Sequence, residues 1–294
     1  MNEEFAIEPT AFRNFDDVRY VLGKFGFHEG RFISALPGKW VKEVYAHLEK
    51  FPDGPAKQKA KEIIRIAKVE RGGIVSCGVA FNPAMSWLKN VAACGKEFNG
   101  ILVSEETTID KQESGCRSIA EIEDSFFGSC REASIFPTVE EFGRVATNLL
   151  SISHEVFLID PYFNFSKSSN IRVLQKFIDI GVARKCKTFV IYTDAKVNKP
   201  NGIDSILRTN FNETGALVKV YHVQKSSSEK DFHPRFLLSK FGGIRFDKGF
   251  EIEGVKGVKR DIVAIDINKH EDLCKLYLDG EHGLKISAEH LFQG

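Results

Sequence analysis

The stretch that decides the fold of the carboxyl-terminal half reads Val220-Tyr-His-Val-Gln-Lys-Ser-Ser-Ser-Glu-Lys-Asp-Phe-His-Pro-Arg-Phe-Leu-Leu-Ser-Lys-Phe-Gly-Gly-Ile-Arg-Phe-Asp-Lys-Gly-Phe250. Two strand-like runs flank a polar loop, and the second carries His233 and Arg235. Side chains alternate between the two faces of a strand, so residues two apart leave the same face. We therefore expect an imidazole and a guanidinium side by side, a pair that suits a phosphoryl group. The alternative is that His233 is a strand histidine bonded to a neighbouring carbonyl.

The residues after this pair predict a strand, a tight turn and a second strand. Phe236-Leu-Leu-Ser239 forms the first strand, and Gly242-Gly-Ile-Arg-Phe246 follows, with glycines where the backbone must turn. This arrangement resembles the second half of a phospholipase D-like domain, in the divergent branch where His-x-Lys has become His-x-Arg. The resemblance covers the chain from Thr138 to Ile267.

The resemblance implies a chemistry. In the phospholipase D-like superfamily a histidine attacks a phosphodiester without a metal, and two motifs meet at one site. This chain has one motif, so a complete site requires a homodimer with two copies of His233 across a two-fold axis. Arg235 stands where lysine is usual, Lys240 replaces the aspartate, and no Gly-Ser-x-x-Asn follows. These departures favour phosphate binding without turnover, while a metal-independent phosphodiesterase or nuclease and a non-catalytic structural adaptor stay open as alternatives.

Strands alternate with helices before this motif, and the pattern predicts an α/β fold with a mainly parallel or mixed sheet flanked by helices. Ligands of such sheets gather at the carboxyl ends of the strands. Asp160 and Tyr162, which follow a buried run, are therefore expected near Asp194 and the strand of His233. A strand-terminal acid that caps the next loop explains Asp160 equally well. The segment from His270 to Gly294 is expected to be a short helix with a mobile tail.

The amino-terminal part, residues 1–104, mixes amphipathic helices with buried strands and predicts a smaller α/β or α+β domain. Acidic and polar residues from 105 to 136 predict a connector, and residues 137–294 form the expected phospholipase D-like domain. Helices are expected over residues 14–25, 39–50, 56–69 and 83–92, and strands over 74–81 and 98–103.

Composition places the chain among soluble globular proteins, with 294 residues, 43% hydrophobic residues and a formal charge of +1. Basic residues outnumber acidic ones from Lys39 to Arg71 and from Lys225 to Arg260, which suits a polyanion, although solvated faces are a commoner cause. The six cysteines form no Cys-x-x-Cys pair, so we expect free thiols and a cytoplasmic location. The first residues have no signal-peptide pattern, and no apolar run approaches the ~20 residues of a bilayer span.

These observations predict a protein that binds DNA or RNA through phosphate contacts, with no cofactor and no metal. The resemblance implies a subunit of a bacterial antiviral defence or nucleic-acid-processing system, with a membrane phosphoinositide as a variant partner. In the adaptor alternative, the basic helices bind a helicase or an ATPase. The residues expected around His233 are Arg235, Lys240, Arg245 and Lys248, with Asp160 and Tyr162 orienting the ligand.

Overall fold

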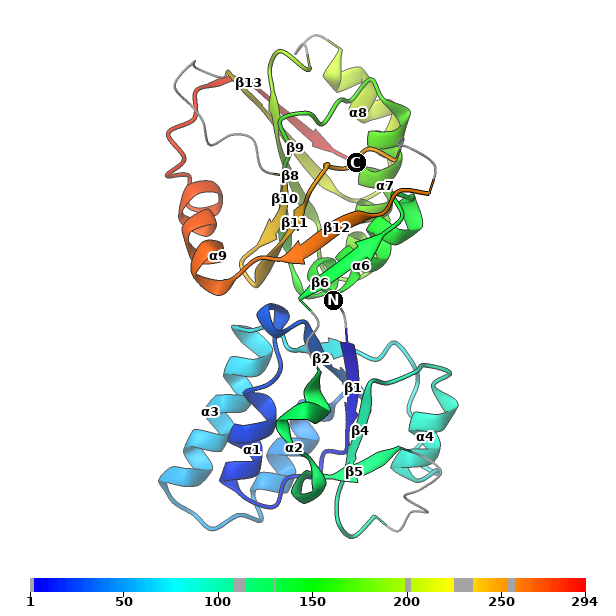
Figure 1. Cartoon of the computed structure of the whole chain (residues 1–294), viewed down its shortest axis with the longest axis vertical. Helices are drawn as coiled ribbons and strands as arrows, with labels where there is room; N and C mark the ends of the chain where they lie inside the picture. Colours follow the sequence, from blue (N-terminus) through cyan, green and yellow to red (C-terminus); the bar gives the residue numbers. More distant parts are fainter. Residues whose placement is uncertain (1–2, 108–114, 129–130, 199–201, 225–234, 253–256) are drawn as a thin grey trace. The chain divides into compact units, whose positions relative to one another are not determined.

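A computed structural model of the chain describes residues 3–107, 115–128, 131–198, 202–224, 235–252 and 257–294. The chain divides into two compact units, one formed by residues 2–130 and the other by residues 131–294. Each unit holds one sheet with helices on its faces (Figure 1). The α/β class expected from the alternating pattern is therefore confirmed.

The amino-terminal unit is built on a fully parallel sheet with the strand order β3-β2-β1-β4-β5. The helices that connect its strands lie on both faces, because parallel neighbours need crossover connections. Phe5 and Ile7 pack with Trp40 on one face, whereas Ala6 packs with Val91 on the other. The strands are β1 (Glu3–Ile7), β2 (Arg31–Ala35), β3 (Ile74–Ser76), β4 (Gly100–Val103) and β5 (Cys116–Ser118), and the helices are α1 (Phe15–Leu22), α2 (Trp40–Leu48), α3 (Pro55–Val69) and α4 (Trp87–Ala93).

Local signals start the helices where the sequence predicts. The Asn14 side chain accepts a hydrogen bond from the backbone N–H of Asp17 at 2.9 Å, which satisfies one of the donors that a helix start leaves unpaired. Thr138 does the same for the backbone N–H of Glu141 at 3.2 Å in the second unit. Both caps precede an apolar stripe that is buried against the sheet.

The segment 105–136 differs from the expected connector. Its middle forms β5 and two short 3-10 turns, Ile119–Glu121 and Asp124–Phe127, in the amino-terminal unit. Its end, β6 (Glu132–Ile135), belongs to the second sheet. The apolar anchor Phe127 is 1% exposed and its ring lies 5.8 Å from that of Phe25. Burial of such a ring outweighs the acidic character of the segment.

The carboxyl-terminal unit holds a mixed sheet with the order β13-β9-β8-β7-β10-β11-β12-β6. Its three central strands β7, β8 and β9 are parallel, and every other pair is antiparallel. The strands are β7 (Glu155–Ile159), β8 (Thr188–Asp194), β9 (Leu217–Val223), β10 (Phe236–Ser239), β11 (Gly242–Phe246), β12 (Arg260–Ala264) and β13 (Ile286–Gln293), and the helices are α6 (Val139–Ile152), α7 (Ser168–Val182), α8 (Ile203–Phe211) and α9 (Ile267–Leu273) with a π-helical turn, Cys274–Leu278.

Helices cover the two faces of this sheet differently. Phe142 of α6 packs on Phe246 of β11 with ring centroids 5.8 Å apart. On the opposite face, Leu273 and Tyr277 pack with Phe157 and Phe236. Figure 1 shows α9 on one side of the sheet and α6 and α7 on the other. No helix within the described ranges combines the length and apolarity needed to cross a bilayer.

The expected mobile tail is wrong. Residues Ile286–Gln293 form the edge strand β13, which pairs antiparallel with β9 and places Phe292 opposite Val218. Partly buried and exposed side chains alternate along the whole strand. Ile286, Ala288 and Phe292 fall on the partly buried face, with Ser287, Glu289 and Gln293 on the exposed face, and this alternation is a strand signal that exposed Leu291 interrupts.

Candidate functional site

Charged side chains gather at one edge of the mixed sheet, where β7 ends and β10 begins. Asp160 directly follows β7, and Arg235 directly precedes β10. Phe236 lies opposite Ile159 in the antiparallel ladder, so both charged residues reach the same edge. The edge therefore forms around an acid and a guanidinium.

The guanidinium of Arg235 is held from three sides. Its Nη1 donates a hydrogen bond to the backbone carbonyl of Asp247 at 2.7 Å. Its Nε lies 3.8 Å from Oδ1 of Asp160, and its Cζ lies 4.8 Å from the ring centroid of Tyr162. Within the described residues a single N–H of this group donates a hydrogen bond. The side chain is 26% exposed, so a ligand can reach this group from solvent.

Asp160 is buried beneath this guanidinium, at 2% exposure. Its Oδ1 accepts a hydrogen bond from the backbone N–H of Tyr162 at 2.8 Å. Burial raises the pKa of the carboxyl to about 6, although N–H groups of Tyr162 and Phe250 and the charge of Arg235 act in the opposite direction. The carboxyl therefore titrates close to neutrality.

Gly249 lets the chain pass close to this pair. Its φ is +70°, a region that side chains of L-residues rarely adopt. A Cβ on this residue would lie 2.7 Å from Oδ2 of Asp160 and 2.8 Å from Cδ of Arg235. Glycine is thus required here by both conformation and space, as the glycine-rich pattern of this stretch suggests.

A second arginine lies at the start of β12. Its register with β11, in which Ile262 pairs with Phe246, brings Arg260 to the same edge. Arg260 is 8% exposed and donates a hydrogen bond to the backbone carbonyl of Glu251. Burial lowers the pKa of Arg260, and the charge of Arg235 lowers it further. Lys167 forms an ion pair with Glu251. The edge therefore brings the basic groups of Arg235, Arg260 and Lys167 together with the carboxylates of Asp160, Asp247 and Glu251.

The structure separates some of the residues expected at the site. Lys240 lies in the turn between β10 and β11, at the opposite end of β10 from Arg235, because a strand carries its two ends to opposite edges of the sheet. Arg245 is not separated in this way: it is exposed on β11 and pairs with Phe236 beside Arg235, and Lys248 is exposed beside Asp247. His233 lies outside the described residues.

Other expected neighbours do meet. The backbone N–H of Asp194 donates to the carbonyl of Pro161 at 3.2 Å, so the ends of β7 and β8 adjoin as predicted. Tyr162 stacks on Arg235, and Gly249 makes the close backbone approach that the glycine pattern suggests. Arg260 and the carbonyl of Asp247 complete the edge without having been predicted. Their sequence signal is weak, because strand pairing places them and local pattern does not.

Metal ligation finds no support in the described part of the chain, where no group of three His, Cys, Asp or Glu side chains is arranged to hold an ion. The five cysteines that the structure describes are free thiols.

Comparisons with known proteins add little to this geometry. No protein-family model and no curated protein sequence matches the chain. A solved structure of TrmBL2, an archaeal chromatin protein described as showing a novel mode of DNA binding, is similar with a TM-score of 0.31 and 13% identity, over 82% of this chain and 86% of that one. A TM-score this low carries no argument about fold or function.

Proposed function

We propose that this protein binds phosphate groups of DNA or RNA at the sheet edge formed by Asp160, Arg235 and Arg260, on a divergent phospholipase D-like domain. The observation that carries the proposal is the guanidinium of Arg235, which three contacts orient while most of its N–H groups stay available. A planar guanidinium presents paired donors that match two oxygens of a phosphate. Its fixed orientation lowers the entropy lost on binding.

Asp160 sets the strength of this binding. When ionised, the carboxylate competes with a phosphate for Arg235, which lies 3.8 Å away. Protonation near the raised pKa of about 6 removes the competing charge. A phosphodiester stays charged near this pKa of about 6. Its affinity for the protein should therefore rise as the pH falls from about 7.5 to about 5.5. The same rise should be absent in Asp160→Asn.

The test is fluorescence anisotropy with a labelled single-stranded oligonucleotide over a salt series. Arg235→Gln should weaken binding about tenfold, the usual cost of a lost charged hydrogen bond. Lys240→Gln is the matched control, because it removes the same charge from the same hairpin at its other end. Equal losses in both variants, or an affinity that does not change with salt, would contradict the proposal. Sedimentation with phosphoinositide liposomes separates a membrane ligand from a nucleic acid.

A second candidate, a metal-independent phosphodiesterase, is favoured by the raised pKa of Asp160. A carboxyl that titrates near neutrality beside a phosphate-binding arginine is a suitable general acid. This candidate predicts EDTA-resistant cleavage of an oligonucleotide that is lost in both Asp160→Asn and His233→Ala. It also requires a homodimer, so a monomer in sedimentation equilibrium counts against it. The adaptor alternative predicts co-purification with a helicase or an ATPase.

A further inference from the structure

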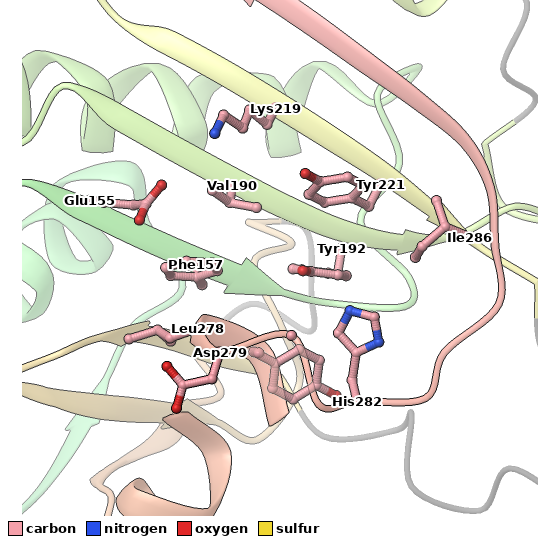
Figure 2. Close-up of a pocket in the computed structure, with 12 residues that line it drawn as sticks. Glu155, Phe157, Val190, Tyr192, Lys219, Tyr221, Leu278, Asp279, His282 and Ile286 are labelled. Carbon is pink, nitrogen blue, oxygen red and sulfur yellow. The ribbon is translucent and has the colours of Figure 1, made fainter. Parts of the chain in front are cut away.

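A hollow of about 420 Å³, separate from the Arg235 edge, lies on the face of the mixed sheet that α9 covers. Its floor consists of alternate residues of β7, β8 and β9, and its wall is the segment between the π-helical turn and β13 (Figure 2). Volumes of this size accommodate small ligands. None of the residues at the Arg235 edge lines it.

Aromatic rings form one end of the hollow around Tyr192. In the parallel register Tyr192 lies opposite Tyr221, and their ring centroids are 5.0 Å apart. The rings of Tyr277 and His282 lie 5.4 Å and 5.5 Å from that of Tyr192. Four rings from three parts of the chain therefore surround one space, as Figure 2 shows for the labelled residues.

The hydroxyl of Tyr192 points to a ligand. Tyr192 is only 5% exposed and lines the hollow. Buried tyrosine hydroxyls ordinarily have a partner. In Figure 2 the phenol oxygen is directed to the side of the hollow where Glu155 and Asp279 lie. A polar group of a ligand at this position would satisfy it.

The charged side chains that line the hollow indicate the sign of the charge on that ligand. Glu155 and Asp279 face one charged amine, Lys219. Burial lowers the pKa of His282, so this imidazole is neutral at neutral pH. Burial raises the pKa of Tyr192, and the nearby carboxylates Glu155 and Glu289 raise it further, because a negative potential opposes a phenolate. Two carboxylates and one amine therefore line the hollow, which favours a cationic ligand over an anionic one.

We propose that this hollow binds an organic ammonium ion of the aliphatic polyamine class. The faces of tyrosine rings attract a cation, and carboxylates at the other end supply a counter-charge for a second amine. The hydroxyl of Tyr192 accepts a hydrogen bond from the ammonium group. The proposal stands apart from phosphate binding, because the two sites share no residue.

Isothermal titration calorimetry of the full chain with spermidine tests the proposal, at constant ionic strength. We expect saturable binding that Glu155→Gln and Asp279→Asn each weaken about tenfold, and that Tyr192→Phe weakens about fivefold through the lost hydrogen bond. Glu97→Gln, which neutralises an exposed carboxylate of the other unit, is the matched control and should change nothing. Near-ultraviolet circular dichroism verifies that each variant is folded.

Two results would overturn this assignment. Spermidine that produces no saturable heat up to millimolar concentration excludes a polyamine site. Equal affinity for wild type and for the lining variants places the spermidine elsewhere on the surface. If Tyr192→Phe fails to fold, Asp279→Asn decides the question, since Asp279 follows the π-helical turn outside the regular strands. Arg235→Gln should bind spermidine normally even if phosphate binding is disproved.

Discussion

The carboxyl edges of the two sheets carry similar residue types but differ in what their side chains contact. At the parallel amino-terminal sheet, Glu8 follows β1 and accepts hydrogen bonds from the backbone N–H of Ser104 and the hydroxyl of Thr107, both at 2.7 Å. This is the point where the strand order reverses, the usual place for a ligand. At the mixed sheet, a single N–H group of Arg235 donates a hydrogen bond to the residues that the structure describes. A favourable topological position thus becomes a site only where its polar groups are not already satisfied by the chain.

The largest expected effect concerns Asp160, the buried acid at the edge of the mixed sheet, which we call the open edge. Its pKa rises from 3.8 to about 6 in the folded chain, so the stability that the protonated carboxyl contributes is complete below about pH 4 and is lost as the pH rises through about 6. Relative to Asp160→Asn, the wild type should therefore lose about 3 kcal/mol of unfolding free energy between these limits. Urea unfolding at several pH values measures the difference. A difference that does not depend on pH would show that Asp160 is solvated or more strongly paired.

At the edge of the amino-terminal sheet, which we call the closed edge, a substitution should lower the stability of the protein and leave oligonucleotide binding unchanged. Glu8→Ala leaves the N–H of Ser104 and the hydroxyl of Thr107 without their acceptor, and should cost about 2 kcal/mol of unfolding free energy. Oligonucleotide affinity should be unchanged. Glu106→Ala, which removes an exposed carboxylate nearby, is the control and should cost less than about 0.5 kcal/mol. A large loss of affinity in Glu8→Ala would mean that this edge also binds the ligand.

Sequence patterns predict the regular elements well where periodicity is strong. The helices α1 and α2 lie within the expected residues 14–25 and 39–50. Two short strands, β1 and β5, are not predicted by the sequence, although the short strands β10 and β11 are. β1 begins with two glutamates, and β5 has only Cys116–Ser118, so partners within the sheet decide both.

Some residues of the candidate site could be predicted from local sequence patterns, and others are placed there only by strand pairing. Asp160 and Tyr162 could be predicted, because they end a buried strand that the sequence marks clearly. Arg260 and the carbonyl of Asp247 could not, because the pairing register of β11 and β12 brings them to Arg235. Lys240 lies only five residues from Arg235 in sequence, yet the strand between them separates their side chains. Proximity in sequence is thus a poor guide wherever a strand intervenes.

A smaller effect is expected from Arg235→Lys, which keeps the charge but changes its geometry. Lysine loses the paired donors and the stacking on Tyr162, so oligonucleotide affinity should fall by about 1 kcal/mol with no activity gained. Increased cleavage would instead support the phosphodiesterase candidate. If the melting temperature falls and the affinity is unchanged, then Arg235 serves mainly to hold the carbonyl of Asp247. Anisotropy, a cleavage assay and thermal unfolding on one preparation distinguish these results.

The smallest effect should come from Lys248, which is exposed beside Asp247. A flexible ammonium at the rim contributes to binding through counterion release, so Lys248→Gln should lower the slope of log affinity against log salt by about 1. The affinity itself should fall less than in Arg235→Lys, because a solvated charge is screened by salt whereas an oriented guanidinium is not. Lys240→Gln should leave the slope unchanged, since Lys240 lies at the opposite edge of the sheet. Equal slopes for both lysine variants would mean that the nucleic acid spans the sheet and contacts both edges, and the open edge would then lose its special role.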